Sequence, residues 1–331
     1  MTEGEKGFRY IMTLPFLSFS LVSLDSVSAT ASVGASALQR CPPDTRTLVR
    51  GSLILSGFFI DHKFKEKKMS KICPLFSGST GNSTYIEGAT GAVLTDAGAS
   101  CKALTAAIKN AGGEIEKIAA VVITHEHIDH IKGLKPLLNA AKGAVLISSA
   151  ETLETLAAAG KIPPHTKTAV IESETLEAGG IAISHFATSH DAVAPGGYCF
   201  FMPDGRKISV CTDLGIMTDT VRSAIAGSDA VLLESNYDID MLKKGPYPAE
   251  LKMRIMSDRG HLSNNACAAE LAGLLKSGTT RFILGHLSRN NNTPLLALSS
   301  AKNALASAGA AVGTDCILEV AAPKNNGVTV L

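Results

Sequence analysis

An apolar run passes into a cluster of imidazoles at Val121-Val122-Ile123-Thr124-His125-Glu126-His127-Ile128-Asp129-His130. The run has the length and composition of a buried strand, so the three histidines and the aspartate lie where that strand ends. Burying such groups unpaired would cost several kcal/mol, whereas a divalent cation satisfies them together. The segment therefore predicts a metal site at the carboxyl end of a strand.

The spacing of these groups excludes one familiar kind of zinc site. A zincin helix needs histidine at the first and fifth positions of HExxH, but the fifth residue counted from His125 is Asp129. The pattern is instead HxHxDH. His125 and His127, which alternate on an extended turn, can reach one metal ion, while Asp129 and His130 can reach a second.

Outside this segment, short apolar runs alternate with alanine-rich helical segments from Met69 onward. This alternation is typical of an α/β domain, although periodicity alone leaves open whether the strands form one sheet or two. The expected strands are 118–124, 144–148, 181–186, 207–212, 230–233 and 281–284. The expected helices are 101–111, 134–141, 150–160, 264–276 and 295–308.

The composition limits the class of protein. With 45% hydrophobic and 18% charged residues, the 331-residue chain can bury a substantial core and is not disordered throughout. Its formal net charge of +1 lacks the basic excess of a dedicated nucleic-acid binder, so any such role must be local. Seven cysteines form no CxxC pair, which indicates reduced, mostly buried thiols and a cytoplasmic protein.

Residues 1–68 differ in character from residues 69–331. Residues 1–68 contain nine basic and six acidic residues, whereas residues 69–331 contain 22 basic and 24 acidic residues. We expect them to be a disordered extension or an over-extended gene start, because the codons for Lys65 to Lys68 would resemble a ribosome-binding site ahead of Met69. The alternative is export, with residues 1–29 acting as a secretory signal. Their apolar stretch is too short and too rich in Ser and Pro for a membrane span, so we expect no stable membrane association.

Four more polar residues follow apolar runs, and their order resembles that of the metallo-β-lactamase superfamily. They are Asp96 in LTDAG, His190 in TSHD, Asp213 in CTDLG and His286 after the strand expected at 281–284. Together with HxHxDH, they extend the resemblance across residues 69–331. The resemblance implies one hydrolase domain with an α/β fold, an αββα four-layer sandwich with metal ions at one edge of its two sheets.

The same resemblance implies how two divalent ions would share the ligands. One ion would take His125, His127 and His190, the other Asp129, His130 and His286, with Asp213 and a water bridging them and Asp96 supporting the site from behind. All of these ligands are nitrogen or oxygen, so Zn²⁺, Mn²⁺ and Fe²⁺ are each chemically plausible. Water between two cations would be largely hydroxide near neutral pH, and hence a nucleophile.

Two residues outside the ligand set suggest phosphodiester chemistry. His261 in GHLSN is more than two ions require, and it could protonate a departing oxygen while Glu234 in ESNYD orients it. The pairing resembles that of RNase Z, although His261 could also simply start the following helix. Asp129, His261 and Glu234 are therefore the candidate catalytic residues. The glycine-containing turn at 77–83 either lines the site or is an ordinary hairpin.

Several segments resemble the YycJ (WalJ) family of metallo-β-lactamase-fold proteins. They are TSHDA, ESNYD, GHLSN and the stretch MLKKGPYP at 241–248. This resemblance implies a metal-dependent exonuclease that digests duplex DNA from 5′ to 3′ and is linked to mismatch repair. The chain departs from it in residues 1–68, which have no match, and at Ile128, where a small polar residue is common.

The charge pattern leaves alternatives open. Lys243, Lys244, Lys252, Arg254 and Arg259 are either a track for DNA or a solvated face. The near-neutral surface would also suit hydrolysis of a small molecule, such as a cyclic phosphodiester or a thioester. A third interpretation is a catalytically idle metal-binding module that serves as a docking platform.

Overall fold

A computed structural model describes residues 69–324 and 327–331. The expectations for residues 1–68, including the export alternative and the domain boundary at Met69, lie outside the described residues. Within the described residues, every helix is too short or too polar to cross a membrane.

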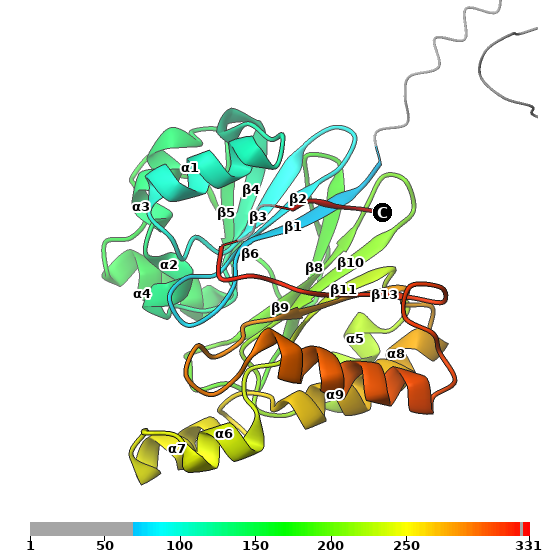
Figure 1. The fold of residues 1–331 in the computed structure, drawn as a ribbon. Coiled ribbons are helices and arrows are strands. Elements are labelled where there is room, and N and C mark those ends of the chain that lie inside the picture. Colours follow the sequence, from blue (N-terminus) through cyan, green and yellow to red (C-terminus); the bar gives the residue numbers. More distant parts are fainter. Residues whose placement is uncertain (1–68, 325–326) are drawn as a thin grey trace, which may run out of the picture. The chain divides into compact units, whose positions relative to one another are not determined.

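The described residues contain two seven-stranded sheets that face each other (Figure 1). In spatial order, the first sheet is β14 (Thr329–Val330), β1 (Lys71–Phe76), β2 (Ser83–Glu87), β3 (Ala92–Thr95), β4 (Ile118–Val122), β5 (Val145–Ser148) and β6 (Thr168–Val170). The second is β13 (Ile317–Val320), β12 (Arg281–Gly285), β11 (Ala230–Glu234), β10 (Lys207–Cys211), β9 (Gly196–Phe201), β8 (Ile181–Ala187) and β7 (Leu176–Ala178). Strands β3 to β6 are parallel neighbours, and so are β10 to β13.

Helices cover the outer face of each sheet (Figure 1). Those on the first sheet are α1 (Cys101–Asn110), α3 (Leu134–Ala140) and α4 (Ala150–Ala158), and those on the second are α5 (Asp219–Ile225), α8 (Asn264–Lys276) and α9 (Pro294–Ser307). The one-turn helix α2 (Ile128–Ile131) follows β4. A separate pair, α6 (Ile239–Lys244) and α7 (Ala249–Ile255), projects beyond α8 and α9 at the lower left of Figure 1.

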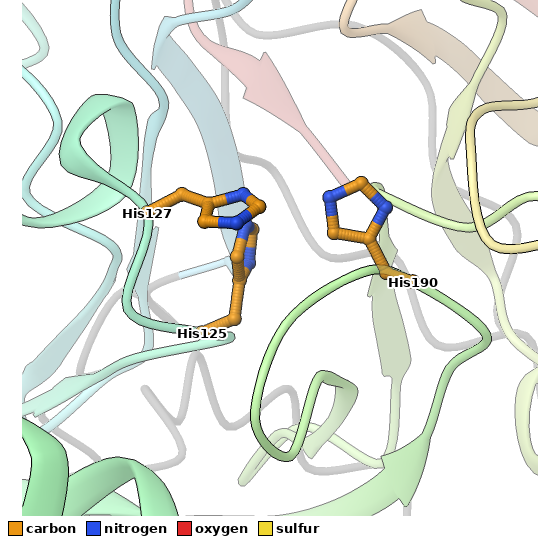
Figure 2. A group of neighbouring side chains, drawn as sticks. All are labelled: His125, His127 and His190. Atoms are coloured by element: carbon orange, nitrogen blue, oxygen red, sulfur yellow. The ribbon is translucent and has the colours of Figure 1, made fainter. Parts of the chain in front are cut away.

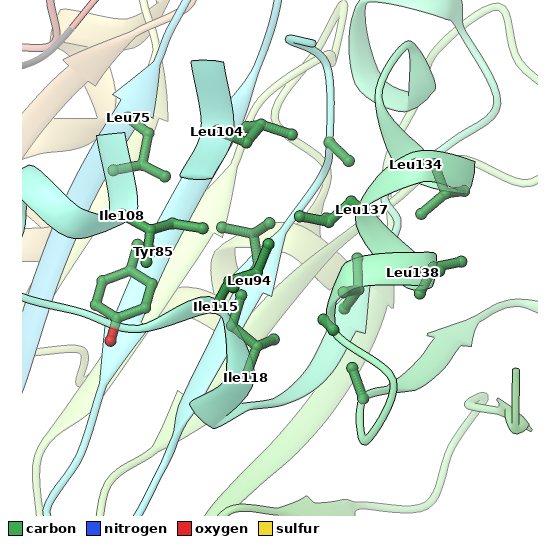
Figure 3. Close-up of a cluster of buried hydrophobic side chains, with 14 of the residues drawn as sticks. Leu75, Tyr85, Leu94, Leu104, Ile108, Ile115, Ile118, Leu134, Leu137 and Leu138 are labelled. Carbon is green, nitrogen blue, oxygen red and sulfur yellow. The ribbon is translucent and has the colours of Figure 1, made fainter. Parts of the chain in front are cut away.

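Three hydrophobic clusters join these layers. Figure 3 shows the first, where side chains such as Leu94 and Leu104 pack between the first sheet and its helices. A second cluster fills the space between the sheets, and a third lies between the second sheet and its own helices. Successive strand residues serve different clusters, because Val93 points between the sheets while Leu94 points to the helices. The expected αββα sandwich is confirmed, and the strands form two sheets.

The eleven expected strands and helices are present, with ends that differ by at most two residues. Other elements carried a weaker signal. β6 and β7 have only three residues each, which is too short for a recognisable period. Helix α7 has only seven residues, too few for its apolar residues to show a clear helical period.

Candidate active site

The expected ligands come from strand ends at one edge of the two sheets. The segment 125–130 follows β4, His190 follows β8, Asp213 follows β10 and His286 follows β12. The carboxyl ends of neighbouring parallel strands meet at the same edge, which is where α/β folds bind ligands. The fold thus brings together residues that are up to 161 positions apart, from His125 to His286.

Three histidines form the first cluster of possible ligands (Figure 2). His125 and His127 come from the HxHxDH segment, and His190 points toward them from a different loop. Their ring centroids lie 4.6 Å apart for His125 and His127, 5.1 Å for His125 and His190, and 5.3 Å for His127 and His190. The ligand atoms lie within 4.8 Å of one another, so one ion could contact all three.

Asp129, His130 and His286 form a second cluster with the same compactness. Asp213 lies between the two clusters. Its Oδ2 is 3.3 Å from Nε2 of His130, and its Oδ1 is 3.8 Å from Nε2 of His190. The carboxylate of Asp213 therefore reaches both clusters, as a bridging ligand must.

Unpaired buried atoms show that these side chains suit metal ions. His125 Nε2, His286 Nε2 and Asp213 Oδ2 are buried without a hydrogen-bond partner in the described structure. Leaving such atoms unpaired costs about 1–3 kcal/mol each. Burial alone would raise the pKa of Asp213, but the imidazoles around it hold that pKa well below its usual range. An anionic carboxylate among nitrogen donors is a ligand set that fits divalent cations.

The backbone at this edge is strained. Asp96, Asp213 and His286 have φ of 60°, 60° and 53°, and they are the non-glycine residues with positive φ in the described part of the chain. A left-handed conformation is unfavourable for residues with a Cβ atom, and such strain gathers at functional sites. All three follow strand ends, where the turn directs their side chains into the site.

Outer hydrogen bonds fix which ring nitrogen of His130 and of His190 faces the centre. The Nδ1–H of His130 donates to Asp96 Oδ2 at 2.8 Å, and that of His190 donates to the Gly260 carbonyl at 2.9 Å. Asp96 also accepts a bond from the Thr124 amide at 2.9 Å, which holds the carboxylate in place. These partners turn Nε2 inward and make it more basic, as outer partners of metal-bound histidines do.

Glu234 is the last residue of β11, is fully buried and contacts two histidines. Its Oε1 lies 2.8 Å from Nδ1 of His261 and 2.8 Å from Nδ1 of His286. Burial alone would raise its pKa, but the adjacent imidazoles lower it to about 2. The sequence suggested only the pairing with His261. The structure adds His286, so Glu234 links the ligand cluster to the candidate proton donor.

The turn at 77–83 contributes to the site, a point that the sequence left open. Asn82 Nδ2 donates to Asp129 Oδ2 at 3.3 Å, and Ser77 Oγ accepts the His286 amide at 2.7 Å. Gly98 permits this packing, since a Cβ there would lie 1.7 Å from the Asp129 carbonyl oxygen. The sequence shows that the turn is made of small polar residues. It does not show that Asn82 and Ser77 bond to residues far away in the chain.

A cavity of about 260 Å³ opens onto the two clusters. Its walls include His127, Asp129, His190, Asp213, His261 and His286, together with Tyr247, Leu251, Arg254 and Ile255 from the region of α6 and α7. The expected ligands and His261 are thus accessible from the cavity.

Comparison with known proteins agrees with this geometry. Residues 92–287 match the family described as the beta-lactamase superfamily domain. The chain belongs to the metallo-β-lactamase superfamily. It is 38% identical over 244 residues to exodeoxyribonuclease WalJ of Streptococcus pneumoniae serotype 2, a match that covers 73% of this chain and 90% of that protein. Exodeoxyribonuclease YycJ of Bacillus anthracis is 36% identical over 239 residues, with coverage of 72% and 90%.

The metallo-β-lactamase fold is also seen among solved structures. The metallo-β-lactamase fold protein YhfI of Bacillus subtilis superposes on this chain with a TM-score of 0.59 at 18% sequence identity. The match covers 79% of this chain and 99% of YhfI. The resemblance to this superfamily and to its YycJ (WalJ) members is confirmed. The chain belongs to this superfamily, and its relatives are named exodeoxyribonucleases. It is therefore a metal-dependent hydrolase.

Proposed function

We propose that this hydrolase is an exonuclease that digests duplex DNA from 5′ to 3′. The observation that carries the proposal is the pair of Glu234 and His261 beside the ligand clusters, because a phosphodiester needs a proton on its departing oxygen. The choice of DNA is supported by the similarity to WalJ and YycJ, both named exodeoxyribonucleases. The direction of digestion and a role in DNA repair follow from the same family resemblance.

Two divalent ions, Zn²⁺ or Mn²⁺ and alternatively Fe²⁺, belong to this proposal. His125, His127 and His190 would hold one, and Asp129, His130 and His286 the other, with Asp213 shared. When bound, such ions supply Lewis-acid chemistry that neutralises phosphate charge and lowers the pKa of water toward neutrality. Asp129 has a second use, because its 22% exposed side chain lines the cavity and can orient the attacking water.

His261 can perform the remaining step, which is protonation of the departing oxygen. Glu234 accepts the Nδ1–H of His261, so Nε2 is the nitrogen that can face a substrate. Burial would lower the pKa of His261, but the Glu234 carboxylate raises it above the usual value. The ring is therefore more readily protonated than a free imidazole and can donate a proton to the departing oxygen.

Replacing His261 with alanine tests this mechanism. We expect H261A to keep its metal content and to lose roughly 10²- to 10⁴-fold in turnover of 5′-labelled duplex DNA with Mn²⁺. H165A is the matched control, because His165 is exposed and belongs to no ligand cluster. Full activity in H261A would refute the proton-donor role, and less than one equivalent of metal in the purified protein would favour the idle docking module.

Two observations favour a second candidate, hydrolysis of a cyclic phosphodiester or a thioester. The net charge is only +1, and the cavity of about 260 Å³ suits a small molecule. Turnover of a chromogenic phosphodiester without release of nucleotides from DNA would select this alternative.

We also assign the hydrolase domain to residues 69–331 and place the protein in the cytoplasm. Among the described residues, Cys101, Cys199, Cys211, Cys267 and Cys316 are free, and all of these except Cys101 are buried. Free thiols are typical of a reducing compartment. Mass spectrometry of the native protein would test both assignments, through its N-terminal residue and the state of its thiols.

A further inference from the structure

The segment 239–260, which we call the arm, contains α6 and α7 and forms part of the cavity wall. Helix α7 has no buried residue and adds nothing to the three hydrophobic clusters. Tyr247 and Arg254 nevertheless line the cavity. Helix α7 therefore helps to form the wall of the cavity and contributes nothing to the hydrophobic core.

Arg254 is held at the cavity wall by an ion pair. Its Nε donates to Oδ2 of Asp191, the residue that follows His190. The guanidinium is planar and has four further N–H donors, a geometry that matches phosphate. Arg254 lines the cavity and 59% of its side chain is exposed, so the guanidinium is accessible to a ligand. Arg254 can therefore bind an anion while Asp191 keeps it in place.

Hydrogen bonds tie the base of the arm to the loop that carries His190. Ser189 Oγ donates to the Asp258 carbonyl at 2.7 Å, and His190 Nδ1 donates to the Gly260 carbonyl at 2.9 Å. The turn is tight, since a Cβ at Gly260 would lie 2.2 Å from the Ile255 carbonyl oxygen. The arm is therefore anchored to the ligand cluster, which fixes the distance between Arg254 and the reacting groups.

Tyr247 gives the same wall an aromatic surface. Its hydroxyl accepts a hydrogen bond from Asn290 Nδ2 at 2.9 Å, so the ring is supported from the segment after His286. Proline on each side, Pro246 and Pro248, restricts the backbone around it. Among the residues that line the cavity, Tyr247 is the aromatic residue other than histidine. Nucleic-acid bases stack on such rings irrespective of sequence.

The charge of the arm suits a polyanion. Residues 239–260 include five basic and three acidic residues, whereas residues 69–331 as a whole carry 22 basic and 24 acidic residues. The positive charge that the rest of the domain lacks is therefore concentrated beside the cavity. A nucleic-acid strand is the partner that uses both this charge and an aromatic platform.

We propose that the arm is the nucleotide-binding subsite of the enzyme. Arg254 binds the phosphate next to the scissile one, and Tyr247 stacks on the base of the terminal nucleotide. The inference rests on the proposed function and adds to it the residues that recognise the strand end.

Kinetics of the full-length, Mn²⁺-loaded enzyme test the role of Arg254. We expect R254A to raise KM for duplex DNA on the order of 10-fold while kcat changes little, because a charge-assisted contact to phosphate is lost. The ratio of kcat/KM for the duplex to that for bis(p-nitrophenyl) phosphate should fall by the same factor, and R254K should recover part of it. K302A on the exposed face of α9 is the matched control.

Duplexes with a normal or an abasic 5′-terminal nucleotide test the role of Tyr247. The wild type should prefer the normal end on the order of 10-fold, Y247A should lose that preference, and Y247F should keep it. If the wild type digests DNA but R254A and Y247A have unchanged KM and end preference, the subsite is refuted and the proposed function stands. If the wild type releases no nucleotides from DNA, both are refuted.

Discussion

The ligand clusters and the arm line the same cavity but differ in how they are held. His125 and His130 are fully buried, and the residues around them carry outer hydrogen bonds and a strained backbone. Helix α7 of the arm has no buried residue, and the arm is held by hydrogen bonds to the loop that carries His190. The proposed metal ligands are thus held rigidly, whereas the proposed subsite stays open, as the binding of a long polymer would require.

Asp213 should show the largest effect, because its carboxylate lies near histidines of both clusters. We expect D213N to lower activity by more than about 100-fold, since losing even an outer partner of a metal ligand costs about 10- to 100-fold. Metal bound per chain, measured by inductively coupled plasma mass spectrometry, should fall as well. Retention of both ions with normal activity would show that the two clusters do not share this carboxylate.

Glu234 should give an intermediate and mixed effect. Because it bonds both His261 and His286, E234Q should reduce metal affinity and turnover together, each on the order of 10- to 100-fold. H261A, by contrast, should reduce turnover alone. Competition with a chromogenic chelator measures the affinity, and an unchanged affinity in E234Q would limit the role of Glu234 to His261.

Stability should separate the core from the arm. L94A empties a fully buried position and should lower the free energy of unfolding by about 2–5 kcal/mol. The side chain of Met253 on α7 is 62% exposed, so M253A should change the free energy of unfolding by less than about 0.5 kcal/mol. Urea denaturation followed by circular dichroism provides both values. A large loss in M253A would mean that the arm packs more firmly than its exposure indicates.

Much of the fold and the ligand set could be predicted because the signals are local. The HxHxDH segment, the apolar run before it and the residues after later strands can each be recognised within about ten positions. The helix at 264–276 was found with its observed ends, because Ser263 caps it and its apolar face is periodic. The pairing of the strands into two sheets came from the family resemblance, since periodicity cannot distinguish one sheet from two.

The sequence by itself determined which side chains are available for metal binding and where strands end, since these depend on residue type and short-range pattern. Tertiary structure decided which of them meet. The two bonds of Glu234, the approach of Asn82 to Asp129 and the anchoring of Arg254 by Asp191 join residues 27 to 63 positions apart. Such contacts depend on the packing of whole sheets and loops, and no local pattern encodes them.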